Sequence, residues 1–275
     1  MKHPAYIPGC EELLLQYDQG VLNVTLNRPH KRNAMNRLMV EELMTVFQSI
    51  ESRRDVRAVV LRGADGNFCA GGDISDMNND SRADSQVDDE ARARDATWHF
   101  NRSFGHLIST VNRAPQLIVC VLEGAVLGGG FGLACVSDLA IAKPNAVFAM
   151  PETGLGIIPA QIAPFVVMRI GVTQARRLTL LGERIDGNTA LQLGLVHHVS
   201  DDPEATLRQN LKYFKKCAPN ATAMTKHLLL DVAERQGLEQ LLDRASDDFA
   251  KAMLSVEGQE GTQAFIEKRR PDWAV

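Results

Sequence analysis

Two glycine-rich segments are the residues of this chain whose pattern most directly suggests chemistry. The first is residues 68–73 (FCAGGD) and the second is residues 128–132 (GGGFG). Each follows an apolar, strand-like run, and glycine lets a backbone approach a ligand closely in conformations that side chains forbid. Two such turns, brought together, would aim two backbone N–H donors at one oxygen, which is the geometry that stabilises an oxyanion. The pattern therefore predicts carbonyl chemistry.

The elements that must hold these turns are short apolar strands that alternate with helices. Strands are predicted over residues 12–17, 21–26, 57–61, 116–122, 139–142 and 146–149. Helices are predicted over residues 36–53 and 98–111, a polar loop over 77–96, and a wholly helical pattern from about residue 203. Alternating strands and helices favour an α/β fold with parallel pairing. We expect a core over residues 1–200 and a helical region over 201–275.

The composition is that of an ordinary globular protein and argues against several classes of partner. The apolar fraction is 45% and the net charge is −4, so nothing predicts a nucleic-acid or membrane surface. The sequence contains neither an apolar run of about 18 residues nor a signal peptide. Its five cysteines lack metal-ligand spacing and fit reduced thiols. We therefore expect a cytoplasmic protein that binds no metal, no nucleic acid and no membrane.

Several ordered blocks of sequence, among them both glycine turns, resemble the crotonase (enoyl-CoA hydratase/isomerase) superfamily. The blocks are residues 21–29 with 33–34, 68–73, 124–138, 151–156, 181–183 with 190 and 194–196, and 265–271. They cover nearly the whole chain, and their order and spacing agree with the family throughout. The resemblance implies the ClpP/crotonase-like fold, an α/β spiral of ββα units with a helical C-terminal region. That region would assemble the chain into a homotrimer or a hexamer (a dimer of trimers).

The ligand that the resemblance implies is an acyl-CoA. No separate cofactor is expected, because coenzyme A is part of the substrate. By position in the family pattern, the thioester oxygen would lie between the backbone N–H groups of Ala70 and Gly129. Gly129 also begins a predicted helix, whose N-terminal end favours negative charge.

The acid–base group distinguishes this chain from many of its relatives. Hydratases of the family commonly carry two glutamates, and the corresponding positions here are Gly132 and Glu152. Glu152 lies in an apolar stretch, so partial burial would raise its pKa and let it act as both acid and base. A single glutamate fits a hydratase, in which it activates water, and equally an isomerase, in which it moves a proton between Cα and Cγ. The glycine at position 132 would free volume for a bulkier acyl branch.

The segment after Glu152 bears on the substrate. Residues 158–165 (IPAQIAPF) replace a run that is glycine-rich in many family members. They resemble bacterial hydratases of branched glutaconyl-CoA esters, the isohexenylglutaconyl-CoA enzyme of acyclic terpene breakdown more than the 3-methylglutaconyl-CoA enzyme. Gln161 is a candidate contact for a distal carboxylate, and Phe165 or Trp98 could line the slot for an isohexenyl tail.

Basic residues near both ends of the chain are candidates for binding the CoA nucleotide. The resemblance suggests Arg28, Lys31, Ala34, Asp73 and Lys268, the last reaching from a neighbouring subunit. Point charges suit phosphates. Asp73 is more readily explained as a cap of the following helix.

Other classes of function remain open at this stage. Some relatives have lost catalysis, or bind RNA alongside it, but such a protein would be expected to damage Glu152 or the glycine turns, and both are intact. Hydrolase or decarboxylase chemistry on the same scaffold is a further alternative, because a fold does not fix a reaction.

Overall fold

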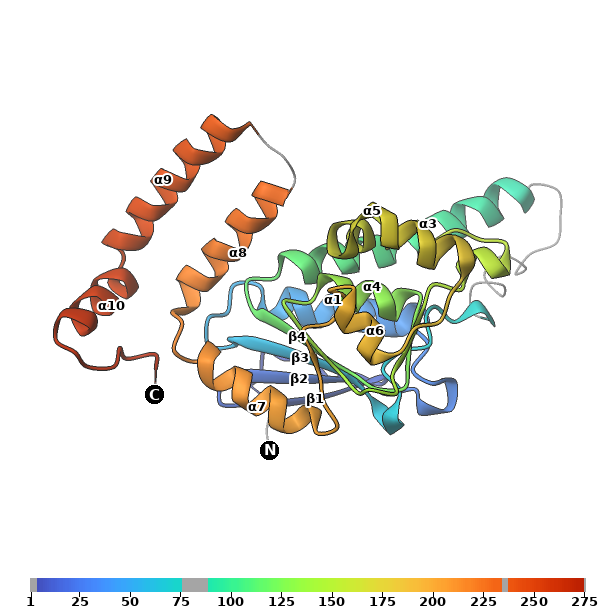
Figure 1. The fold of residues 1–275 in the computed structure, drawn as a ribbon, viewed down its shortest axis with the longest axis horizontal. Coiled ribbons are helices and arrows are strands. Elements are labelled where there is room, and N and C mark those ends of the chain that lie inside the picture. The colour runs from blue at the N-terminus through green and yellow to red at the C-terminus, as the bar shows by residue number, and fades with distance from the viewer. Residues whose placement is uncertain (1–3, 76–88, 234–236, 275) are drawn as a thin grey trace.

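The computed structural model describes residues 4–75, 89–233 and 237–274, which fold around a six-stranded sheet (Figure 1). The strand order is β1-β2-β3-β4-β6-β8. The strands are β1 (Leu13–Asp18), β2 (Val21–Leu26), β3 (Ala58–Gly63), β4 (Leu117–Leu122), β6 (Leu139–Ala142) and β8 (His198–Val199). β1 and β2 form the predicted antiparallel hairpin, and every later pairing is parallel. The α/β class with parallel pairing is therefore confirmed.

A second, smaller sheet carries the chain toward the glycine turns. It pairs β5 (Ala125–Leu127) in parallel with β7 (Val147–Ala149). Cys69 forms a parallel bridge with Val126, so residues 68–69 run beside β5. The carboxyl ends of parallel strands meet at one edge of a sheet, and here that edge leads into three turns. β5 itself was not predicted, because its three residues are too short to give a periodic pattern.

Helices cover both faces of the large sheet (Figure 1). They are α1 (Arg37–Ile50), α3 (Asp89–Arg113), α4 (Gly129–Val136), α5 (Ala163–Leu181), α6 (Gly187–Gln192) and α7 (Pro203–Phe214). Three short 3₁₀ turns are η1 (Pro29–Lys31), η2 (Ala64–Gly66) and η3 (Glu152–Leu155). Helices α1, α3, α4 and α5 contact one another in succession on one face. On the other face, Leu207 of α7 packs against Val60 and Val119.

Helix α3 begins earlier than predicted. The predicted loop over residues 77–96 lies outside the described residues as far as residue 88, and from Asp89 onward the chain is helical. The start of the helix was not predicted, because its first residues are mostly charged and the helical spacing of apolar residues begins only at about residue 100. The helix ends at Arg113, two residues before Pro115, as expected where a proline prevents the helix from continuing.

The last three helices form an arm that extends from the body of the molecule (Figure 1). They are α8 (Pro219–Ala233), α9 (Leu238–Leu254) and α10 (Val256–Ile266). Lys226 of α8 anchors the arm, since its Nζ lies 2.7 Å from Oδ2 of Asp138. Large apolar side chains on the arm face solvent in the single chain, including Phe249 at 70% and Phe265 at 85% exposed. No helix in the described part of the chain is long and apolar enough to cross a membrane.

Candidate active site

The two glycine turns and Glu152 meet at the edge of the small sheet, as the sequence pattern predicts. A Cβ atom placed on Gly128 would lie 3.5 Å from Cα of Gly71 and 3.1 Å from Oε1 of Glu152. Gly71 and Gly128 have φ angles of 97° and 49°, a region that disfavours residues with side chains. Glycine is therefore required here for close approach and for backbone conformation alike.

The backbone N–H groups of the turns show which donors a ligand could use. The N–H of Ala70 already donates to the carbonyl oxygen of Arg32 at 3.0 Å, and that of Gly128 donates to Ala149 at 3.1 Å. Within the described ranges, the N–H groups of Gly72 and Gly129 donate no hydrogen bond to another backbone group. The prediction of Ala70 as an oxyanion donor is therefore wrong, because its amide fastens the turn to the preceding loop.

Gly72 stands in the place predicted for Ala70. It bridges Met35 in parallel, with Met35 N donating to Gly71 O and Asp73 N donating to Met35 O, each at 2.8 Å. These bonds belong to the neighbours of Gly72, so its own N–H faces away from Met35. Gly72 and Gly129 both line the pocket that contains Glu152. Gly129 is the first residue of α4, where the positive end of a helix dipole supports an anion.

Glu152 begins η3, directly after β7 and Pro151. Its Oε2 atom is buried, and no described residue offers it a hydrogen bond. Burial raises the pKa of the Glu152 carboxyl above its ordinary value, against a smaller lowering by its own backbone N–H. A buried, unpartnered carboxylate is costly to the fold. A raised pKa brings the carboxyl closer to the working pH, which suits a group that must both accept and return a proton.

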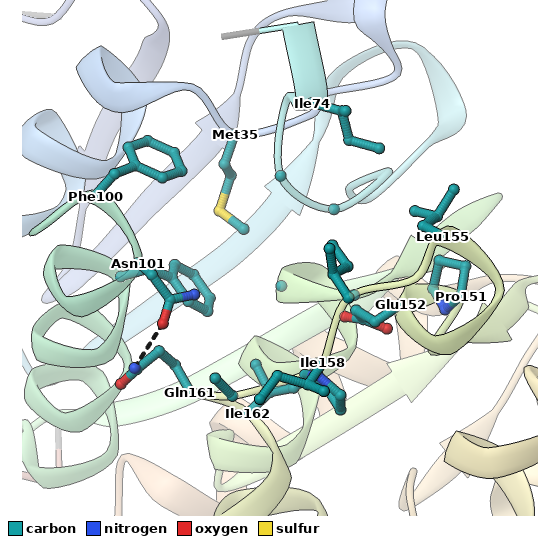
Figure 2. A pocket seen from close by; sticks show the side chains of 18 of the residues that line it. Met35, Ile74, Phe100, Asn101, Pro151, Glu152, Leu155, Ile158, Gln161 and Ile162 are labelled. Carbon is teal, nitrogen blue, oxygen red and sulfur yellow. Dashed lines mark hydrogen bonds between the residues drawn. The ribbon is translucent and has the colours of Figure 1, made fainter. Parts of the chain in front are cut away.

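Apolar side chains form most of the pocket wall (Figure 2). They come from four parts of the chain and are Met35, Val40, Ile74, Phe100, Phe104, Leu155, Ile157, Ile158 and Ile162. Neither aromatic residue predicted for the acyl slot lines this pocket. Trp98 is 58% exposed, because it precedes Phe100 by two positions, which places it about 200° around the helix, on the opposite side. Phe165 packs against the main core, and Ile162 faces the pocket instead.

The position of the absent second glutamate is closed. A Cβ atom on Gly132 would lie 2.4 Å from Cγ2 of Ile162 and 3.0 Å from Cδ1 of Ile108. The expectation that Gly132 frees volume for an acyl branch is therefore wrong, since Ile162 fills that volume. Gly132 and Ile162 thus make a close apolar contact between α4 and the segment before α5.

Gln161 does lie in the pocket wall, together with a residue that sequence analysis missed. Nε2 of Gln161 donates to Oδ1 of Asn101 at 2.7 Å (Figure 2). Asn101 lies on the face of α3 that Phe100 and Phe104 turn to the pocket. A single polar residue within that apolar stripe is the signal that could have revealed it.

Three of the predicted CoA-binding residues are engaged within the protein. Arg28 is 11% exposed at its side chain and pairs with Glu12 and with Asp73, each at 3.1 Å, and its Nη1 donates to the carbonyl of Ala34. Asp73 also accepts from the backbone N–H of Ser75 at 3.1 Å, which confirms it as a cap. The polar groups of Arg28, Ala34 and Asp73 thus hold the loop beneath the first glycine turn, and their assignment to CoA binding stays a prediction.

Lys31 and Lys268 are the predicted CoA contacts that face solvent. Lys31 is 45% exposed at its side chain, with Nζ 3.9 Å from Oδ2 of Asp73. Lys268 follows α10 on the arm, at the opposite end of the molecule from the start of α3 (Figure 1). Within one chain, the arm therefore does not bring Lys268 to the pocket. The described residues contain no group of three or more His, Cys, Asp or Glu side chains that could hold a metal ion.

Comparison with known proteins gives consistent matches along nearly the whole chain. The family model described as enoyl-CoA hydratase/isomerase matches residues 16–275. The solved structure of Pseudomonas aeruginosa AtuE is 54% identical, with a TM-score of 0.90, and covers 96% of this chain and 100% of that one. The 1,2-epoxyphenylacetyl-CoA isomerase of Escherichia coli (strain K12) is 30% identical over 96% of this chain and 98% of its own length. A probable enoyl-CoA hydratase of Mycobacterium bovis is 32% identical, also over 96% and 98%.

Proposed function

Because this chain belongs to the enoyl-CoA hydratase/isomerase family, we propose that it adds water across the 2,3 double bond of a branched enoyl-CoA. The substrate we propose is isohexenylglutaconyl-CoA. One observation carries the proposal. The buried, unpartnered Oε2 of Glu152 shares an apolar pocket with the two free N–H groups of Gly72 and Gly129.

The reaction follows from this arrangement. The thioester oxygen accepts hydrogen bonds from the N–H groups of Gly72 and Gly129 and gains negative charge as water attacks Cβ. Each such donor typically stabilises the transition state by about 3 kcal/mol. Glu152 removes a proton from the attacking water and returns a proton to Cα of the enolate. The raised pKa of Glu152 makes both transfers accessible to one group.

The choice of substrate rests on the pocket wall and on residues 158–165. Aliphatic and aromatic side chains such as Ile158, Phe100 and Phe104 suit a long hydrocarbon branch. The run from Pro159 to Pro164 supplies the resemblance to hydratases of branched glutaconyl-CoA esters. A smaller relative of the same substrate, 3-methylglutaconyl-CoA, would occupy the same site.

Isomerisation is the second candidate, and the closed space at Gly132 favours it. Ile162 fills the position of a second carboxylate, so Glu152 is the one carboxylate among the described residues that line the pocket. One glutamate can move a proton from Cγ to Cα without water entering the product. One of the relatives is itself an isomerase, although of an epoxide.

We also propose that the chain assembles into a trimer, or a dimer of trimers, in the cytoplasm. The solvent-facing apolar side chains of the arm, such as Leu242, Phe249 and Leu254, would be covered by neighbouring subunits. Lys268 could then reach the CoA of a neighbour. Light scattering at several protein concentrations measures the assembly, and a monodisperse monomer would contradict it.

Mass analysis of products formed in deuterated water tests the reaction. We expect isohexenylglutaconyl-CoA to gain one molecule of heavy water, with deuterium at Cα. A product of unchanged composition apart from exchanged deuterium, with a shifted double bond, would identify an isomerase instead. Glu152→Gln protein, treated in parallel, reports any background hydration.

A further inference from the structure

One wall of the acyl pocket contains a pair of amides with no role in the chemistry described above. Asn101 of α3 and Gln161 lie among Phe100, Phe104 and Ile162. An amide placed among apolar side chains costs free energy unless it is hydrogen-bonded. The bond between the two side chains, 2.7 Å from Nε2 of Gln161 to Oδ1 of Asn101, satisfies one atom of each. The remaining polar atoms, Nδ2 of Asn101 and Oε1 of Gln161, determine what else the pair can bind.

The orientation of Gln161 is set by two residues of α3. A Cβ atom on Gly105 would lie 2.0 Å from Oε1 of Gln161, so the glutamine occupies a hollow that exists only because residue 105 is glycine. Nη1 of Arg102 lies 2.6 Å from the same point. A guanidinium has donors alone and therefore favours an oxygen beside it. The Gln161 side chain thus has its nitrogen toward Asn101 and its oxygen in the hollow at Gly105.

This orientation leaves Asn101 with a free donor on the pocket side. Its Oδ1 is occupied by Gln161, and its Nδ2 turns toward the cavity (Figure 2). No acceptor for Nδ2 is found among the described residues. A purely hydrocarbon branch would leave this donor unpaired, which is unfavourable in an apolar wall.

We propose that Asn101 binds a carboxylate oxygen on the acyl group, and that Gln161 is the positioning residue that holds Asn101 for this contact. The site would then select monothioesters of dicarboxylic acids over neutral acyl-CoA esters. The inference rests on the proposed function, since it takes an acyl-CoA to be the ligand.

A matched pair of substrates isolates the carboxylate. 3-Methylglutaconyl-CoA and 3-methylcrotonyl-CoA differ only by that group. In Asn101→Leu protein, we expect the ratio of kcat/KM for the acidic ester to that for the neutral ester to fall about 10- to 100-fold, as for a lost hydrogen bond to a charged group. Asn101→Asp should lower the ratio further through charge repulsion. Gln161→Met should lower it less, chiefly by raising KM for the acidic ester.

Control measurements keep the inference separate from the proposed function. His106→Leu, an exposed change on the same helix, should leave the ratio as in the wild type. Equal losses on both esters in Asn101→Leu protein, or an unchanged ratio, would overturn the inference. If the wild type hydrated neither these esters nor isohexenylglutaconyl-CoA, the proposed function would fail on its own. Dissociation constants for glutaryl-CoA and butyryl-CoA, which also differ by one carboxylate, would then still test Asn101.

Discussion

The two sides of the acyl pocket are built by different means. The side that holds Glu152 is made from backbone at the edge of the small sheet, where Gly71 and Gly128 adopt positive φ angles and leave no room for a side chain. The facing side is made from side chains of α3 and of residues 157–162. A change on the first side moves backbone atoms, whereas a change on the second exchanges one surface for another. The backbone therefore sets the positions of Glu152 and the two turns, while the opposite wall is formed by side chains that can vary.

The two sides meet at Gly132. Ile162, which belongs to the acyl side, occupies the space beside a glycine of the catalytic side. Because Ile162 lines the pocket and also fills the space at Gly132, a second carboxylate at position 132 would require a change in the pocket wall. The variants below test whether the two sides are as separable as this division implies.

The largest effect is expected on the catalytic side. Glu152→Gln should lower kcat by at least about a hundredfold, a typical contribution of general acid–base catalysis, because the amide cannot accept the proton of the attacking water. Binding of the CoA ester, measured by calorimetry, should be largely kept. Glu183→Gln is a matched control, since this half-buried glutamate pairs with Arg177 outside the pocket. A Glu152→Gln variant that keeps a tenth of the activity would remove Glu152 from the assigned role.

A smaller effect is expected where the two sides meet. Gly132→Glu should lower the free energy of unfolding by about 1–3 kcal/mol through overpacking against Ile162. Adding Ile162→Ala should restore part of that loss by reopening the space. Chemical denaturation of the single and double variants measures both changes. A Gly132→Glu protein as stable as the wild type would show that the space is open after all.

The placement of the two glycine turns beside Glu152 could be predicted from sequence, whereas the choice of the first N–H donor could not. Glycine patterns identified the two turns, and the apolar neighbours of Glu152 predicted its burial and the direction of its pKa shift. Ala70 was assigned in place of Gly72 because the choice depends on a hydrogen bond to Arg32, nearly forty residues earlier in the chain. A long-range pairing of this kind leaves no local mark on the sequence.

The acyl side was predicted less well, because it depends on helix phase and on side-chain packing. Trp98 and Phe100 are equally plausible as pocket residues until the rotation of α3 is known. Asn101 could be assigned to the pocket only from the structure, where it accepts a hydrogen bond from Gln161. The filling of the space at Gly132 by Ile162 required the position of the segment before α5, which no pattern within 158–165 reveals.

A pH-dependent effect on stability is expected to accompany the loss of the carboxylate. The folded protein raises the pKa of Glu152 above 4.5, so the protonated carboxyl is favoured in the folded state. Its stabilising contribution is present below the pKa of the unfolded chain and is lost as pH rises through the folded value. Glu152→Gln protein, which is always neutral, should therefore have a higher melting temperature than the wild type at neutral pH, and the difference should shrink toward pH 4. A wild type that is the more stable protein at pH 7 would contradict this.

The smallest effect is expected from Trp98, and it tests the boundary of the acyl side. Trp98 is exposed and packs edge-on against His99, with ring centroids 4.9 Å apart, outside the pocket. Trp98→Leu should change kcat/KM by less than about twofold, as for an ordinary surface substitution. Phe104→Leu is the matched comparison on the same helix, since the Phe104 ring lies 3.1 Å from a Cβ position on Gly129 and should alter kcat/KM more. Steady-state kinetics on one branched substrate measures both. If Trp98→Leu had the larger effect, the acyl group would extend past the wall formed by Phe100 and Phe104, and the side-chain surface that selects it would include Trp98.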